Sequence, residues 1–284
     1  MPGMSEPLAL VPPPCRMITG IRVDATSYAD ATARVMAWAA AGESRYVCVS
    51  NVHAAVEASE SPEFHKLMLE ADLVTPDGMS LVRALQILGV KEATRVYGPT
   101  LTLHVCEQAA QRGLPVAVYG GREESQEAFA AAMQARFPAL RLVEMIVPPF
   151  RPLTPEEDAA ETVRLNRSGA RIVLVMLGCP KQERWMAAHR GRIPAVMLGV
   201  GAALDFHAGL LPTAPRWMQR AGLEWLFRLL TEPRRLWRRY LHNIPRFLWM
   251  FLCQLLRRRY CQSDGAGYTG ANPKPWSVDD ERDD

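Results

Sequence analysis

Five short apolar stretches of this chain each run into a glycine or a polar turn. The stretches are residues 46–50, 72–75, 115–119, 171–177 and 195–200. Helical patterns follow at residues 54–60, 80–88, 123–137 and 181–190. Short buried strands that alternate with helices are typical of a parallel sheet covered by helices. The sequence therefore predicts an α/β fold, with a mostly parallel, Rossmann-like sheet, helices on both faces and a helical, basic C-terminal region.

The strand pattern stops where an arginine-rich helical region begins, which indicates two parts of the chain. We assign residues 17–205 to an α/β domain that carries the chemistry and residues 206–260 to a basic helical appendage. Residues 1–16 include three consecutive prolines, and residues 261–284 are rich in Gly, Pro and acidic side chains. Both terminal segments are predicted to be disordered.

The basic block over residues 216–259 holds eleven arginines and two glutamates, although the whole chain carries a net charge of only +3. A charge this uneven predicts an anionic partner, and its sign alone leaves phospholipid, pyrophosphate and nucleic acid open. The block has no lysine and little glycine, and its Trp, Leu and Phe content favours lipid over nucleic acid.

Three prolines of the appendage, Pro215, Pro233 and Pro245, each stand where a proline can begin a helix. Basic helices of this kind are expected to rest on the anionic surface of a membrane. The aromatic residues expected at headgroup depth are Trp237, Tyr240, Trp249 and Phe251. The competing interpretation is an internal helical subdomain whose aromatic side chains form a core.

No stretch reaches the roughly 20 apolar residues that cross a bilayer, and the nearest, residues 247–256, lies between arginines. The N-terminus lacks the pattern of a secretion signal. Six cysteines form no C-x-x-C pair, which indicates free thiols in a reducing cytoplasm. We therefore expect a cytoplasmic protein that is peripheral at the inner face of the cell membrane.

Polar residues follow the ends of the predicted strands, where open α/β sheets bind ligands. Asp77 follows one strand and precedes a helix, so we expect its carboxylate to face the cleft as a catalytic base. The competing interpretation is that Asp77 caps the N-terminus of that helix. Asn51 either holds substrate hydroxyls or terminates its strand. Gln182 begins a helix, where solvated polarity is the alternative to a role in binding.

Glycines at strand ends can bind phosphate through their backbone N–H groups. The candidates are Gly120, Gly121, Gly199 and Gly201. No G-x-G-x-x-G follows the first strand, which argues against a dinucleotide cofactor. The chain also lacks H-E-x-x-H and a strict D-x-D, so we expect neither a metal nor a cofactor. Arginines such as Arg95 must then neutralise a diphosphate.

Six motifs occur in a fixed order along the chain. They are P-D-G at 76–78, R-V-Y-G at 95–98, G-C-P-K-Q-E-R-W at 178–185, G-V-G-A-A-L-D-F at 199–206, A-P-R-W-M-Q-R-A-G-L-E-W at 214–225 and E-P-R-R at 232–235. In these motifs the chain resembles the WecG/TagA/CpsF glycosyltransferases, which work in wall teichoic acid, enterobacterial common antigen and exopolysaccharide assembly. The resemblance implies an inverting, metal-independent enzyme that moves a sugar from a UDP-sugar donor to an undecaprenyl-diphosphate-linked sugar.

The resemblance also implies roles for single residues. Asp77 falls on the proposed base of the family, while Asn51, Arg95, Gln182 and Asp205 fall on positions that are expected to bind substrate. Arginines of the appendage are implied to meet the acceptor diphosphate at the membrane. These arginines are Arg216, Arg220, Arg228, Arg234 and Arg235.

Two departures from the family pattern lie near the expected sugar site. Many members have Thr-Pro-Asn where this chain has Val49-Ser50-Asn51, and many have an acid soon after R-V-x-G, where this chain has Pro99-Thr100. The V-S-N-V-H and R-V-Y-G-P segments are similar to those of xanthan-type glucosyltransferases, which build cellobiosyl-diphosphate lipids. We therefore expect UDP-glucose as the donor, in exopolysaccharide assembly at a bacterial cell envelope.

Two alternatives to this donor and this function stay open. The first is a transferase of teichoic acid or common-antigen type that uses UDP-N-acetylmannosamine or its uronic acid. The second is a different class of protein, a non-catalytic nucleotide-sugar binder.

Overall fold

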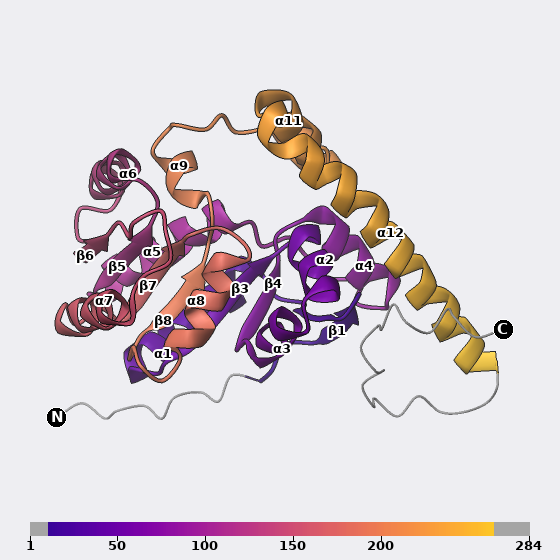
Figure 1. Cartoon of the computed structure of the whole chain (residues 1–284), viewed down its shortest axis with the longest axis horizontal. Coiled ribbons are helices and arrows are strands. Elements are labelled where there is room, and N and C mark those ends of the chain that lie inside the picture. The colour runs from indigo at the N-terminus through magenta and orange to yellow at the C-terminus, as the bar shows by residue number, and fades with distance from the viewer. Residues whose placement is uncertain (1–10, 264–284) are drawn as a thin grey trace.

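The computed structural model describes residues 11–263, apart from the side chains of Arg216, Arg220 and residues 258–263. At its centre lies a six-stranded sheet with the order β4-β3-β8-β7-β5-β6, in which all neighbouring strands are parallel. The strands are β3 (Arg45–Ser50), β4 (Leu73–Pro76), β5 (Val116–Gly120), β6 (Leu142–Ile146), β7 (Ile172–Met176) and β8 (Val196–Gly199). Helices lie on both sides of this sheet (Figure 1), so the predicted α/β fold is confirmed.

Alternate residues of each strand pack into two cores, one on each face of the sheet. In β3, Tyr46 and Cys48 belong to one core, whereas Val47 and Val49 belong to the other. Because both faces of the central strands are covered, these strands are mostly apolar. The first core is covered by α2 (Val52–Glu60), α3 (Pro62–Glu70), α4 (Met79–Ile87), α7 (Pro155–Arg167) and α8 (Lys181–His189). The second is covered by α1 (Tyr28–Ala41), α5 (Gly98–Arg112), α6 (Glu123–Arg136) and α9 (Ala203–His207).

A hairpin of β1 (Cys15–Ile18) and β2 (Ile21–Asp24), which the apolar pattern did not predict, lies beside β4. The side chain of Asp24 accepts a hydrogen bond of 2.7 Å from the backbone N–H of Val74, so it occupies a donor of this edge strand. β1 begins within the segment 1–16 that was predicted to be disordered. Residues 1–10 and 264–284, which hold most of the two terminal segments, lie outside the described residues.

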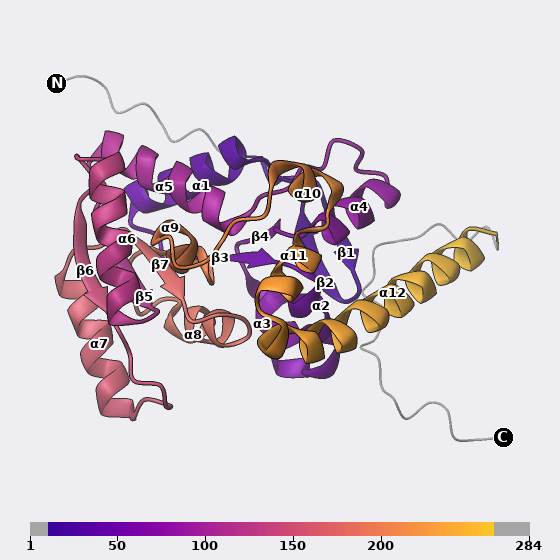
Figure 2. The same ribbon diagram turned by 90° about the horizontal axis from the view of Figure 1, so that it is seen from above.

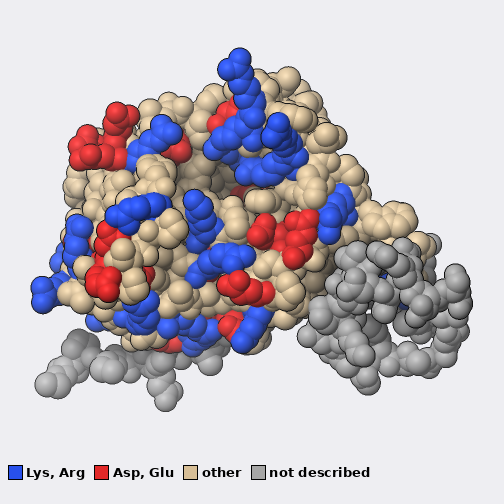
Figure 3. All heavy atoms as spheres, viewed as in Figure 1, with Lys and Arg blue, Asp and Glu red and all other residues tan. Residues whose placement is uncertain are grey.

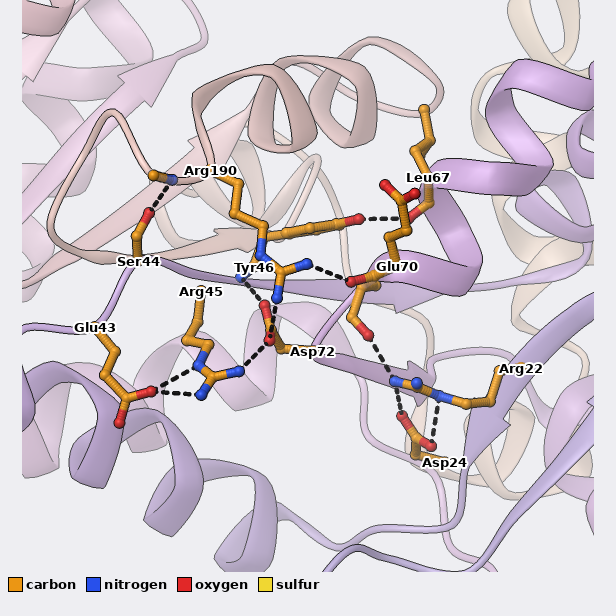
Figure 4. Close-up of polar contacts among 12 residues, drawn as sticks. Arg22, Asp24, Glu43, Ser44, Arg45, Tyr46, Leu67, Glu70, Asp72 and Arg190 are labelled. Carbon is orange, nitrogen blue, oxygen red and sulfur yellow. Dashed lines mark hydrogen bonds and ion pairs between the residues drawn. The ribbon is translucent and has the colours of Figure 1, made fainter.

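A closed network of charges joins three elements at the amino ends of the central strands (Figure 4). The side chain of Asp72 is 4% exposed and accepts hydrogen bonds from Arg45 at 2.6 Å and from Arg190 at 2.9 Å. Its second oxygen accepts the backbone N–H of Tyr46 at 3.0 Å. One carboxylate thus holds together the start of β3, the residue before β4 and the residue after α8.

Beyond residue 205 the described residues form helices and no strand, as the sequence predicts. These helices are α9, α10 (Arg216–Ala221), α11 (Glu224–Thr231) and α12 (Pro233–Ser263). α12 runs past α2 and extends away from the sheet (Figure 2). Asn243 of α12 lies 3.0 Å from Nδ1 of His53 on α2, and His242 lies 2.8 Å from Glu60. Gln254 accepts the N–H of Thr19 at 2.9 Å, which ties α12 to the hairpin.

Pro245 lies inside α12, so the expectation that it begins a helix is wrong. A proline inside a helix leaves the carbonyl four residues earlier without its donor and costs about 3 kcal/mol. That carbonyl belongs to Leu241, which is on a solvent-exposed part of the helix. Phe247 and Phe251 follow and are buried in the first core, which offsets the cost. Phe251 therefore packs in the interior, contrary to its expected place among the lipid headgroups.

Candidate active site

A pocket of about 380 Å³ lies at the carboxyl ends of the central strands, between the sheet and the C-terminal helices. The loops after β3, β4, β7 and β8 form its floor, and residues of α11 and α12 form the opposite wall. In Figure 3, basic side chains gather over α11 and the start of α12, above a hollow in this face. The pocket thus stands where the strand-end residues were predicted to converge.

Asp77 is held by three hydrogen bonds and lines this pocket. Its N–H donates to the carbonyl of Ser50 at 2.8 Å, and its own carbonyl accepts from Nε of Arg95. Oδ1 accepts the N–H of Gly98, the first residue of α5, at 3.0 Å. Oδ2 makes no hydrogen bond to any part of the chain that the structure describes. One carboxylate oxygen is therefore anchored while the other is available to a ligand.

The helix-cap interpretation of Asp77 is wrong for the helix that follows it. The N-cap of α4 is Gly78, and α4 has no side-chain cap hydrogen bond. Burial raises the pKa of Asp77, and Glu224 raises it further. Arg95, the N–H of Gly98 and Arg228 oppose this rise. A carboxylate whose pKa lies above its ordinary value is a stronger base than an exposed aspartate.

Arg95 is committed to partners within the protein. Its guanidinium makes an ion pair of 2.7 Å with Glu224 of α11, and both side chains are largely buried, at 17% and 13% exposure. The guanidinium also lies over the ring of Tyr97, 4.2 Å from its centroid. Arg95 therefore connects the base to the C-terminal helices, and its predicted contact with a substrate diphosphate stays a prediction.

Asn51 lines the pocket and also caps a helix. Its Oδ1 accepts the N–H of His53 at 3.0 Å at the start of α2. Its Nδ2 has no hydrogen-bond partner within the described residues, so the same side chain can fix the helix and donate to a ligand. The structure is therefore compatible with both interpretations of Asn51, as a residue that binds substrate hydroxyls and as one that ends its strand.

Gln182 is 3% exposed, so the interpretation as solvated helix polarity is wrong. Its Oε1 accepts the N–H of Gly201 at 3.0 Å, and its Nε2 donates to Glu183 at 2.9 Å. These bonds clamp the loop after β8 onto the start of α8. Gly199 allows the close approach, because a Cβ there would lie 2.7 Å from Met186 and 3.0 Å from Nε2 of Gln182. Of these glycines, Gly201 lines the pocket.

Gly120, Gly121 and Asp205 are not among the residues that line the pocket. The carbonyl of Gly120 accepts a hydrogen bond of 2.8 Å from Gln126, and a Cβ at Gly121 would lie 2.5 Å from Leu204. Both glycines allow close packing at the end of β5, where a Cβ at Gly120 would lie 2.9 Å from the backbone of Met176. Asp205 lies on α9, where its carbonyl accepts the N–H of Leu210 at 2.9 Å.

Among the described side chains of the C-terminal helices, three arginines line the pocket: Arg228, Arg235 and Arg239. Arg235 makes an ion pair of 2.6 Å with Glu232, but Arg228 and Arg239 have no acidic partner within the described residues. Burial and the neighbouring Arg228 and Arg235 lower the pKa of Arg239. Arg234 does not line the pocket. The side chains of Arg216 and Arg220 lie outside the described residues.

Sequence reasoning missed Arg239, although a signal for it exists: Arg235 and Arg239 are four residues apart and share a helix face. It also missed Glu183, which lines the pocket and is 1% exposed, and whose Oε2 has no hydrogen-bond partner in the part of the chain that the structure describes. Burial raises the pKa of Glu183. The third omission is Glu224, whose partner Arg95 lies far away in the sequence and cannot be found from local spacing.

The fold and the pocket define an α/β enzyme with a carboxylate on the floor of its cleft and arginines on the opposite wall. A family model described as the glycosyl transferase WecG/TagA/CpsF family matches residues 16–260. The chain belongs to this family and is a glycosyltransferase. The predicted family and enzyme class are thereby confirmed.

Proposed function

We propose that this protein is an inverting glycosyltransferase that transfers glucose from UDP-glucose to an undecaprenyl-diphosphate-linked sugar in bacterial exopolysaccharide assembly. The observation that carries the proposal is the geometry of Asp77. Its Oδ1 is anchored by Gly98, whereas Oδ2 has no partner among the described residues, and Asp77 lines the pocket together with Arg228 and Arg239. The carboxylate offers a base for the acceptor hydroxyl, and the arginines offer a site for the acceptor diphosphate.

The proposed reaction is a single displacement. Oδ2 of Asp77 takes the proton of the acceptor hydroxyl as that oxygen attacks the anomeric carbon from the face opposite UDP. The new C–O bond forms as the bond between the anomeric carbon and the phosphate oxygen breaks, and the electron pair leaves with UDP. Arg228, Arg235 and Arg239 would hold the acceptor diphosphate, because guanidinium groups bind phosphate through charge-assisted hydrogen bonds.

The exposed surface of α12 supports attachment to a membrane. Its exposed apolar residues are Trp237, Leu241, Leu248, Trp249, Leu252 and Leu256. At 100° per residue they fall on one stripe about 120° wide, which is the pattern of a helix that lies in a lipid interface. Among residues 11–263, no helix is long and apolar enough to cross a membrane. We infer peripheral binding at the cytoplasmic leaflet, whose anionic lipids attract arginine.

A donor panel tests the proposal. The full-length protein is incubated with a short polyprenyl-diphosphate glucose and, in separate reactions, with UDP-glucose, UDP-N-acetylmannosamine and its uronic acid. We expect lipid product from UDP-glucose, with the anomeric configuration inverted as measured by NMR. Transfer from another donor instead would mean that glucose is not the sugar donated. A retained anomeric configuration would contradict single displacement. Binding of UDP-sugars without transfer would point to a nucleotide-sugar binder.

A further inference from the structure

We propose that Glu224 is a positioning residue: its ion pair with Arg95 connects α11 to the backbone of Asp77 and holds this carboxylate in register with the acceptor hydroxyl. The inference rests on the proposed function, in which Asp77 is the base. Glu224 touches no reacting atom, but its ion pair would determine how efficiently Asp77 removes the proton.

The contacts form a short chain from helix to base. Oε2 of Glu224 lies 2.7 Å from Nη1 of Arg95, and Nε of the same guanidinium donates to the carbonyl of Asp77. The segment that carries Arg95 is tied to the base twice more. The N–H of Val96 donates to Pro76 at 2.9 Å, and the N–H of Gly98 donates to Oδ1 of Asp77 at 3.0 Å. A shift of Arg95 therefore shifts Asp77.

The start of α11 is itself seated beside the helix that follows Asp77. Arg83 of α4 donates to the carbonyl of Ala221 at 3.3 Å, and a Cβ at Gly222 would lie 3.2 Å from Met79. Glu224 follows directly and lines the pocket with Asp77. The ion pair thus joins the C-terminal helices directly to the segment that holds the base.

Removing the charge of Glu224 leaves Arg95 as a buried cation without its carboxylate. The nearest remaining anion is Asp77, whose charge already interacts with Arg95. We expect Arg95 to turn toward that carboxylate, because a buried charge without a partner is costly. The base would then be both displaced and weakened. The Glu224–Arg95 pair therefore keeps the guanidinium on the backbone of Asp77 and away from its side chain.

The pH dependence gives a second, independent signature. Among the described residues, the charged or titratable groups that share the pocket with Asp77 are Arg95, Glu224, Arg228, Arg235, Arg239, His53, Glu183, Cys179, Tyr97 and Tyr240. Asp77 works as a base only when ionised, so activity is present above its pKa and is lost as the pH falls through it. Glu224 raises the pKa of Asp77 and Arg228 lowers it. Glu224→Gln must therefore move the acidic limb of kcat/KM to lower pH, and Arg228→Gln must move it to higher pH.

The test compares Glu224→Gln with Glu60→Gln in the full-length protein. Glu60 also pairs with the C-terminal region, through His242 and Arg246 of α12, but it does not line the pocket. For Glu224→Gln we expect kcat to fall by about 10- to 100-fold with an unchanged KM for the UDP-sugar, because small displacements of a catalytic group have effects of this size. Glu60→Gln should keep the wild-type kcat and pH profile.

A double substitution tests whether Glu224 acts through Arg95. If Glu224 acts through Arg95, then Arg95→Gln and Arg95→Gln/Glu224→Gln should have the same kcat, because the second change removes nothing further. Additive losses would overturn the inference, as would a wild-type kcat and an unshifted acidic limb for Glu224→Gln. If Asp77→Asn retained full turnover, the proposed function itself would fail. If kcat fell in Asp77→Asn but not in Glu224→Gln, the positioning role of Glu224 would be wrong while the proposed function would stand.

Discussion

The two ends of the central sheet use the same residue types in opposite ways. At the amino ends, Asp72 accepts hydrogen bonds from Arg45, Arg190 and the N–H of Tyr46, so both of its oxygens have partners (Figure 4). At the carboxyl ends, Asp77 has one oxygen anchored and one without a partner in the described part of the chain. The first end is a closed network that stabilises the fold, and the second is left incomplete.

The arginines differ between the two ends in the same manner. Arg45 and Arg190 both pair with Asp72. Arg228 and Arg239, by contrast, line the pocket and have no acidic partner within residues 11–263. Leaving cations unpaired at a partly buried site costs stability, and a bound anion recovers that cost. In this protein, an arginine without an acidic partner is therefore a better indication of function than an arginine that is merely charged.

The largest expected effect is that of Asp77→Asn. Asparagine can still accept the N–H of Gly98 through its side-chain oxygen, so the loop should keep its conformation. Without a carboxylate the acceptor hydroxyl loses its base, and we expect kcat to fall by about 10²- to 10⁴-fold. Steady-state assays of lipid product measure this loss, and calorimetry should find UDP binding intact. Asp72→Asn, the matched carboxylate at the opposite end of the sheet, should keep the wild-type kcat.

Arg239→Gln should have the next largest effect. Loss of a charge-assisted hydrogen bond of about 1.5–3 kcal/mol corresponds to an increase of roughly 10- to 100-fold in the KM for the polyprenyl-diphosphate acceptor. The KM for the UDP-sugar should change little. Arg238→Gln is the control, because its guanidinium lies over Trp237 and does not line the pocket. Equal effects of the two substitutions would mean that general positive charge on α12, rather than a site at Arg239, binds the acceptor.

Local patterns were sufficient to predict the buried strands and the position of Asp77. An apolar run that ends at a glycine or a polar turn depends only on neighbours in the sequence, and each of the five predicted runs overlaps a strand of the sheet. β6 was missed because it lies at the edge, where most of its residues are only partly buried and Glu144 interrupts the run. The hairpin of β1 and β2 was missed because charged residues, Arg16 in β1 and Arg22 and Asp24 in β2, interrupt its apolar pattern.

Tertiary partners could not be read from the same patterns. Gln182 was weighed as a solvated residue because its partner Gly201 belongs to the loop after another strand. Arg95 was assigned to a diphosphate because Glu224 lies in a helix that the local sequence does not place near it. In both cases the sequence pointed to a residue that lines the pocket. Its hydrogen-bond partner could not be predicted, because that partner comes from a distant segment of the chain.

The smallest effect, and the one that completes the comparison, concerns stability at the amino ends of the sheet. Asp72→Asn places an amide donor against the arginines and the N–H of Tyr46 and removes the shared charge. We expect the free energy of unfolding to fall by about 2 kcal/mol, as for a buried hydrogen-bonding group that loses its partners. Arg45 and Arg190 are 36% and 39% exposed and can regain water, which limits the loss. Urea denaturation measures the change, and a stability equal to that of the wild type would mean that this closed network contributes nothing to the fold.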